Sequence, residues 1–210
     1  MSRLSVLVEE NPLSPRLLLA TNNKGKVREY KSLLHDLPYQ LVTLAEAGVT
    51  AVEETGKSME ENATLKAVAS AKESGLLSLA DDSGLEVDIL GGEPGILSAR
   101  YAGEGASDTE KVSYLLVRLK DVPLERRTAQ FRCVIAIAAP AGKVELCTGE
   151  CPGFIIFAPR GNRGFGYDPV FYVPKYDRTM AELPLALNNR ISHRALAAQK
   201  ARAILERMAA

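Results

Sequence analysis

The sequence predicts an α/β protein that folds as one domain, or as two small lobes that share a sheet. A chain of 210 residues is within the usual size of a single domain. Near its start, an apolar run is followed by a polar loop with a glycine and then by a helical pattern, an order typical of α/β units. Farther on, residues 131–157 hold apolar runs separated by a Pro-Ala-Gly-Lys turn, which is typical of antiparallel strands.

The first third of the chain is expected to hold two strands and two helices. The strands are residues 16–20, where an arginine precedes four apolar residues, and residues 39–43. The first helix carries four apolar side chains on one face: Val27, Tyr30, Leu33 and Leu34. The second helix runs from about Ser58 to Lys72, and Ser58 and Glu61 have the spacing of a capping box.

The most unusual stretch is Ala80-Asp81-Asp82-Ser83-Gly84-Leu85. Residues 75–80 are expected to form a strand that runs into the two acids, Ser83-Gly84 to break it, and residues 85–90 to form a second strand. Adjacent carboxylates repel each other at a poorly solvated site, and a divalent cation such as Mg²⁺ removes that cost. A polar turn is an equally strong interpretation of these residues alone, because Asp-Ser-Gly is common in turns. If the strand stays regular, the two aspartates point to opposite faces.

The rest of the chain predicts a helix, four strands and a C-terminal helix. Residues 108–120 are expected to be helical, with Val112, Leu115, Leu116 and Leu119 on one face. The strands are expected at residues 131–139, 144–148, 153–157 and 170–174. The last helix is expected to open near residue 191, with Ser192 as its N-cap.

Three polar segments are candidates for binding a ligand. Residues 21–26 lie between a strand and a helix, so helix amides and two lysines could hold an anion; a lysine-rich helix cap is the simpler interpretation, and the spacing of a P-loop is absent. Residues 161–169 interleave glycines with two aromatic residues and an aspartate, which suits stacking on a flat ligand. His193 and Arg194 lie at a helix N-terminus, where cations are disfavoured unless an anionic or electron-rich group faces them.

The composition argues against several classes of partner. Lys plus Arg and Asp plus Glu each number 26, so the net charge is zero and no nucleic-acid polymer is expected as a partner. We find no secretory signal and no apolar run near the ~18 residues that span a bilayer, so we expect no membrane association and a cytoplasmic protein. Cys133, Cys147 and Cys151 lack the partners of a zinc site and are expected to be free thiols.

Seven motifs carry a resemblance to one family. They are Thr21-Asn22-Asn23-Lys24-Gly25-Lys26, Glu53-Glu54-Thr55-Gly56, Glu61-Asn62-Ala63 with Lys66-Ala67, Ala80-Asp81-Asp82-Ser83-Gly84-Leu85, Pro94-Gly95 with Ser98-Ala99-Arg100-Tyr101, Gly164-Phe165-Gly166-Tyr167-Asp168-Pro169, and Ile191-Ser192-His193-Arg194. In this order and spacing, over residues 16–208, they resemble the inosine/xanthosine triphosphate pyrophosphatases, the Ham1/RdgB-like enzymes. Each motif alone is weak, and the seven together are specific.

The resemblance implies a twisted mixed β-sheet with two α/β lobes flanking a central cleft. It implies a single two-lobed domain over residues 16–210, preceded by a loose extension at residues 1–15, and a homodimer. The implied reaction is the Mg²⁺-dependent hydrolysis of ITP, dITP and XTP to the monophosphate and pyrophosphate. Such an enzyme removes deaminated purines from the nucleotide pool.

The resemblance also assigns roles to residues. Asp82 would activate the attacking water and bind Mg²⁺ together with Glu53, which falls on the family position in preference to Glu54. Asp81 would be a second ligand or would orient the site. The expected substrate-binding residues are Thr21, Asn22, Asn23, Lys24, Gly25 and Lys26 for the triphosphate, Lys66 and Arg100 for phosphate charge, Ser83, then Phe165, Gly166, Tyr167 and Asp168 for base and sugar, and His193 and Arg194 for the base.

One position departs from the family pattern. A lysine usually lies five residues before the histidine, and this chain has Asn188 there, with Arg190 as the nearest cation that could replace it. Asn188 is nonetheless expected to contact the substrate. For base selection, donors from His193, Arg194 and loop amides would satisfy the O6 acceptor of hypoxanthine or xanthine and oppose the amine of adenine. Guanine also has a keto group at this position, so its exclusion must arise at the 2-position of the ring.

Two other functions are compatible with parts of the sequence. A Maf-like pyrophosphatase acting on pyrimidine or modified nucleotides would share the architecture, but the pairing of residues 165–168 with residues 192–194 argues against it. A non-catalytic nucleotide sensor is the alternative from another class. The intact acids Glu53, Asp81 and Asp82 disfavour a sensor, because a binding protein has no need of metal-binding carboxylates.

Overall fold

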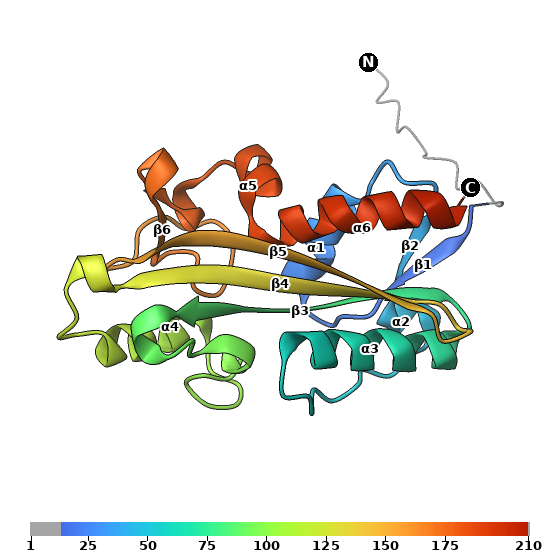
Figure 1. The fold of residues 1–210 in the computed structure, drawn as a ribbon, viewed down its shortest axis with the longest axis horizontal. Coiled ribbons are helices and arrows are strands. Elements are labelled where there is room, and N and C mark those ends of the chain that lie inside the picture. Colours follow the sequence, from blue (N-terminus) through green and yellow to red (C-terminus); the bar gives the residue numbers. More distant parts are fainter. Residues whose placement is uncertain (1–13, 210) are drawn as a thin grey trace, which may run out of the picture.

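A seven-stranded mixed sheet runs the length of the molecule, with helices packed on both of its faces (Figure 1). The structure is a computed structural model, and it describes residues 14–209. The expected N-terminal extension, residues 1–15, thus lies almost wholly outside the described residues, and the first strand begins at Arg16. The strand order is β2-β1-β3-β4-β5-β6-β7, which confirms the predicted α/β class with a mixed sheet.

The sheet changes from parallel to antiparallel at its third strand. Strands β1 (Arg16–Leu19) and β2 (Gln40–Thr43) are parallel, and β1 is also parallel to β3 (Leu77–Val87). The remaining strands pair antiparallel in chain order: β4 (Thr128–Ala138), β5 (Val144–Ile155), β6 (Phe171–Val173) and β7 (Arg178–Thr179). The long strands β3, β4 and β5 therefore form the frame to which both halves of the molecule attach.

Two predicted breaks in the strands are wrong. Ser83 and Gly84 do not end β3, because both pair in register with Cys133 and Arg132 of β4. The strand instead ends at Val87, and Asp88–Leu90 forms a short 3-10 helix, η1. The predicted strands at residues 144–148 and 153–157 are one strand, β5, in which Pro152 is tolerated because β6 pairs only with Phe154 and Ile155.

Within residues 14–209, six α-helices connect and cover the strands. They are α1 (Lys24–Leu33), α2 (Leu44–Ala47), α3 (Met59–Ser74), α4 (Asp108–Arg118), α5 (Leu185–Ile191) and α6 (His193–Ala209). Ser58 caps α3 by accepting from the Glu61 amide. The Glu61 carboxylate accepts from the Lys57 amide instead of the Ser58 amide, so the predicted capping box is not formed. Ser192 caps the start of α6 as expected, by accepting from the Ala195 amide. The short helices α2 and α5 were not predicted. Among the described residues, no helix is both long and apolar enough to cross a membrane.

The buried side chains form two lobes on the shared sheet. In the first lobe, α3 packs on one face against Ala80 and Val134, while α1 and α6 pack on the other against Leu79 and Ile135. In the second lobe, α4 packs with Leu85, Val87 and Phe131 and with residues of β5 and β6. Since β3 and β4 contribute to all three clusters, these two strands fix the lobes relative to each other.

Strand β3 has an unpaired edge where the two lobes meet. Its neighbour β1 pairs only with Leu77, Ser78 and Leu79. Farther along, the hydroxyl of Ser98 donates to the Gly95 carbonyl and accepts from the Leu85 amide, so the loop after η2 (Gly95–Leu97) covers the far end of the edge. Between these covers, residues 80–84 carry no strand partner on one side, and this is where the sequence places its two adjacent acids.

Candidate active site

A cavity of about 480 Å³ surrounds the unpaired edge of β3 and takes its walls from both lobes. This volume lies within the range of small-molecule sites. Most of the predicted site residues line it: Thr21, Asn22, Asn23, Gly25, Lys26, Lys66, Asp82, Ser83, Phe165, Gly166, Tyr167, Asp168, Asn188, His193 and Arg194. Lys24, Glu53 and Arg100 are not among the residues that form its wall.

The N-terminus of α1 forms one wall, and its amides are already capped. The side-chain oxygen of Asn23 accepts from the Gly25 and Lys26 amides at 2.8 and 3.1 Å. Lys24 begins the helix and is exposed, whereas Lys26 turns inward. The predicted anion site therefore offers Lys26, Thr21 and Asn22 at the cavity, with fewer free amides than the sequence indicated.

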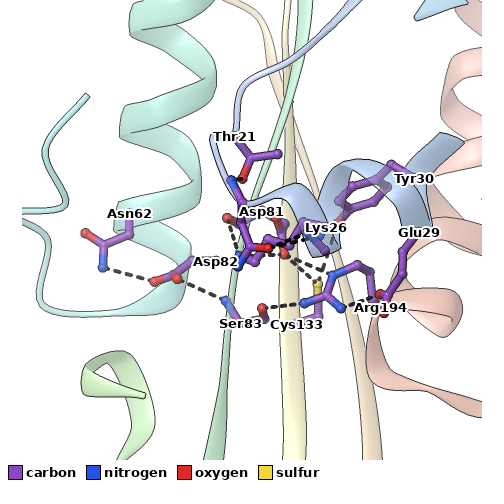
Figure 2. Close-up of polar contacts among 12 residues, drawn as sticks. Thr21, Lys26, Glu29, Tyr30, Asn62, Asp81, Asp82, Ser83, Cys133 and Arg194 are labelled. Atoms are coloured by element: carbon purple, nitrogen blue, oxygen red, sulfur yellow. Dashed lines mark hydrogen bonds and ion pairs between the residues drawn. The ribbon is translucent and has the colours of Figure 1, made fainter. Parts of the chain in front are cut away.

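Asp82 faces α3 and the cavity and is held at both carboxylate oxygens. The buried amide of Asn62 donates to Oδ2 at 3.0 Å, and the Ser83 amide donates to Oδ1 at 2.9 Å (Figure 2). Asn62 is itself fixed, because its side-chain oxygen accepts from the Gly56 amide. Burial raises the pKa of Asp82, Lys66 opposes this shift, and Glu54 adds to it.

Asp81 points to the opposite face and is surrounded by cations. The Lys26 ammonium lies 3.0 Å and the Arg194 Nε 3.4 Å from its Oδ2, and the buried Cys133 thiol lies 3.7 Å from the same oxygen (Figure 2). Burial alone would raise the pKa of Asp81, but Lys26, Arg194 and Lys66 together lower it. Asp81 is thus an anion that holds two cavity cations in place. The expectation that regular pairing sends the two aspartates to opposite faces is confirmed.

Arg194 is buried and its guanidinium is bonded to three protein groups. It forms an ion pair with Glu29 at 2.5 Å, donates to the Ser83 hydroxyl at 2.8 Å and contacts Asp81. Its carbon Cζ lies 5.5 Å from the centroid of the Phe165 ring. Because so many of its donors are engaged by the protein, Arg194 ties α1, β3 and α6 together at the cavity wall.

Lys66 reaches the edge of β3 from α3. Its ammonium donates to the Asp81 carbonyl at 2.7 Å and forms a close ion pair with Glu54. Arg100 lies 3.9 Å from the other oxygen of Glu54. The structure thus brings Glu54, rather than Glu53, to the cavity wall, while Glu53 is exposed. The assignment of Glu53 as a metal ligand stays a prediction.

The far end of the cavity is aromatic. Residues 164–168 form a turn in which the Asp168 carboxylate accepts from the Phe165 amide at 3.1 Å, and burial raises the pKa of Asp168 to about 7. The His193 ring stacks on Phe131 at 4.8 Å, and burial, followed by the charge of Arg194, lowers the pKa of this histidine. Its Nδ1 is buried with no hydrogen-bond partner among the described residues. A neutral imidazole beside aromatic rings suits a flat, polar ligand.

Sequence reasoning missed several residues of this wall. Glu29 was hidden because it is an ordinary helix carboxylate, and only its ion pair with Arg194 reveals it. Asp108 and Lys111 were assigned only to an amphipathic helix, although both line the cavity. The predicted substitute Arg190 is exposed and lies outside the cavity wall. The three cysteines are free thiols, as expected, and the structure buries all three.

The arrangement combines an oriented carboxylate, a cluster of cations and an aromatic end. The cations Lys26 and Lys66 both lie within hydrogen-bond distance of the Asp81 carbonyl, next to Asp82. Such a site can hold a polyanion at one end, a flat ring at the other, and a water molecule next to a carboxylate base.

Comparison with known proteins agrees with this description. The model of the Ham1 family matches residues 17–204. A dITP/XTP pyrophosphatase of Desulforamulus reducens is 53% identical over 92% of this chain and 96% of that protein, and one of Bacillus subtilis is 47% identical over 90% of this chain and 96% of that protein. A solved HAM1 protein of Coxiella burnetii has a TM-score of 0.85 at 41% identity, covering 92% of this chain and 99% of that one.

Proposed function

Because the chain belongs to the Ham1 family, we propose that it hydrolyses non-canonical purine nucleoside triphosphates, namely dITP, ITP and XTP. The products are the nucleoside monophosphate and pyrophosphate, formed by adding one water across the bond between the α and β phosphates. The match to this chain covers 96% of each of the two relatives named dITP/XTP pyrophosphatase, so the comparison extends over nearly the whole of those proteins.

One observation of the site carries the proposal: Asp82 stands oriented at the cavity next to a cluster of lysines. Hydrolysis of a phosphoanhydride needs positioning and neutralisation of charge more than a covalent nucleophile. Lys26 and Lys66 lie at the edge of β3 next to Asp82, where they would neutralise the phosphates. Asn62 fixes the Asp82 carboxylate. Because the pKa of Asp82 is raised, this carboxylate is a better acceptor for the proton of the attacking water.

Mg²⁺ is proposed as the cofactor because the available oxygen ligands suit it. Among residues 14–209, no group of three or more His, Cys, Asp or Glu side chains is arranged to hold a metal alone. Mg²⁺ does not require one, since it commonly takes one or two carboxylates and fills its remaining positions with water and substrate phosphates. Asp82 and a carboxylate of the 53–54 loop would hold it, and when bound it would offset negative charge on the phosphates.

The aromatic end would bind the base. Phe165 and Tyr167 supply ring faces, and His193 supplies an unpartnered ring nitrogen next to Phe131. In a neutral histidine with Nδ1 protonated, this nitrogen donates to a keto oxygen of the base, and an amino group at that position would leave the donor unpaired. Arg194 contributes by fixing the wall, with its charge shared among Glu29 and Asp81.

The test is pyrophosphate release from ITP, XTP, GTP and ATP, with Mg²⁺ and with EDTA, for wild type and Asp82→Asn. We expect Mg²⁺-dependent turnover of ITP and XTP far above GTP and ATP, and a loss of at least about 10²-fold in kcat for the variant, because the base is removed. Asn keeps the shape of the side chain but has only one acceptor oxygen, so it loses one of the two hydrogen bonds from Asn62 and Ser83, and the thermal melting temperature should fall by a few degrees.

Other outcomes separate the alternatives. Preferred turnover of dUTP or UTP would indicate the Maf-like activity. Nucleotide binding without pyrophosphate release would indicate a sensor. Full activity of Asp82→Asn would exclude this carboxylate as the base.

A further inference from the structure

The first turn of α4 contributes an ion pair to the cavity wall that the proposed reaction does not yet use. Lys111 and Asp108 lie three residues apart on the helix, and the Lys111 ammonium is 2.6 Å from Asp108 Oδ1. Both residues line the cavity around β3. The Lys111 side chain is only 13% exposed, although lysine usually remains in water unless something holds it.

Asp108 also connects this lysine to the aromatic end of the cavity. Its second oxygen, Oδ2, accepts from the Gly166 amide at 2.7 Å, in the turn that carries Phe165 and Tyr167. The Asp108 carboxylate therefore bridges Lys111 and the ring-binding loop at residues 164–168. The lysines assigned to the phosphates, Lys26 and Lys66, instead meet at the Asp81 carbonyl on the first lobe.

The hydrogen-bonding capacity of Lys111 is only partly used. An ammonium has three N–H donors. Among the described residues, Asp108 is the only acceptor found for it, which leaves two donors next to the cavity. A largely buried lysine with free donors is costly for the empty protein, and a ligand acceptor in the cavity would remove that cost.

A cation is missing at another position on the wall of the same cavity. Position 188, where the family pattern has a lysine, is an asparagine in this chain, and Asn188 lines the cavity. Arg190 is exposed and outside the wall, so it does not supply the missing charge. Lys111 is the only cation that α4 and α5 place on the wall of this cavity.

We propose that Lys111 binds the substrate at its base end, donating to a keto oxygen of the purine and replacing the lysine that is absent at position 188. This assignment rests on the proposed function. An ammonium donor at this end favours ring carbonyls and disfavours ring amines, so Lys111 contributes to selection of keto-purines over adenine.

The test is a reciprocal exchange. Lys111→Asn removes the donor, and Lys111→Asn with Asn188→Lys returns a lysine from the other wall. We expect the single variant to lose about 10- to 100-fold in kcat/KM for ITP and XTP, mainly through KM, with little change for ATP. The double variant should recover most of that loss. Lys120→Asn is the matched control, because this lysine follows the same helix but is 72% exposed.

Two further measurements keep the result interpretable. Lys111→Gln keeps more of the side-chain length than Asn does and also removes the ammonium, so it should reproduce the loss if Lys111→Asn unfolds, which thermal melting would detect. The dependence on the base is the second measurement, because a loss for ITP and XTP that spares ATP would assign the effect to a donor at the base end of the cavity.

Equal losses for ITP, XTP and ATP would overturn the inference, since they would place Lys111 at the phosphates. Kinetics of Lys111→Asn and Lys111→Gln that match Lys120→Asn would overturn it as well. Either result leaves the pyrophosphatase activity of the wild type intact. Absence of wild-type turnover would instead contradict the proposed function itself.

Discussion

At the scale of single residues, the two neighbouring aspartates are driven to different protonation behaviour by the faces they occupy. Asp82 faces α3, where burial outweighs its partners and raises its pKa. Asp81 faces α1 and α6, where Lys26 and Arg194 overcome the effect of burial and lower its pKa. One carboxylate is therefore suited to accept a proton and the other to hold cations, which is a common way to divide roles between two acids.

The two glutamates of the 53–54 loop are expected to have different roles. Glu54 is engaged by Lys66 and Arg100, so Glu53 keeps the free carboxylate. We expect Glu53→Gln to raise the Mg²⁺ concentration for half-maximal rate by about tenfold. Glu54→Gln should instead raise KM for the nucleotide, because it releases Lys66. Magnesium titrations of both variants at saturating ITP would check this, and the reverse pattern would make Glu54 the ligand.

Asp168 should make stability depend on pH. Its folded-state pKa of about 7 lies above the ordinary aspartate value of 3.8, so its protonated form favours the folded state. That stabilisation is complete below pH ~4 and is lost as the pH rises through 7. Between pH 5 and 8, wild type should lose on the order of 2 kcal/mol of unfolding free energy relative to Asp168→Asn.

Urea denaturation at the two pH values would measure this difference. Asp108→Asn is the control. The pKa of Asp108 is lowered in the folded protein, so its carboxylate is ionised between pH 5 and 8 in both the folded and the unfolded chain. A pH-independent difference between wild type and Asp168→Asn would show that the carboxyl is already ionised at pH 5.

At the scale of elements, Gly149 of β5 sets the position of α6. A Cβ there would lie 2.2 Å from the His193 carbonyl oxygen and 2.4 Å from the Ala197 amide nitrogen, and neither backbone atom can move without moving the helix. We expect Gly149→Ala to cost about 3 kcal/mol of unfolding free energy and to raise KM for ITP, because His193 and Arg194 shift. Denaturation and kinetics would test this, with exposed Glu150→Ala as the control.

Much of the fold could be predicted from the sequence because periodicity and capping act locally. The strands at 16–19 and 128–138, helices α1, α3 and α4, and the Ser192 cap all follow from neighbouring residues. The continuity of β3 through Ser83-Gly84 could not be predicted. The glycine at position 84 is required by a distant contact and does not end the strand, because a Cβ there would lie 2.2 Å from the Gly95 carbonyl oxygen. The same limit explains why motifs located most of the site, whereas Lys111 and Glu29 required the packing of distant helices.

At the scale of the whole molecule, we expect a homodimer. The resemblance to the family implies it, and Leu146 of β5 is 47% exposed, an apolar side chain that a partner would cover. Size-exclusion chromatography with light scattering should give a mass near twice 22.7 kDa. A mass of one chain at micromolar concentration would contradict this expectation.

The ion pair of Asp81 with Arg194 also has a consequence for biosynthesis. The two residues are separated by 113 positions in the chain, so a ribosome has released the first lobe's strands long before it adds the arginine. Until then, Asp81 lacks one of its two strong partners, and burying it is costly. Domains usually fold as units while the chain is being made. We therefore expect the contacts that complete the site to form only after α6 has been made.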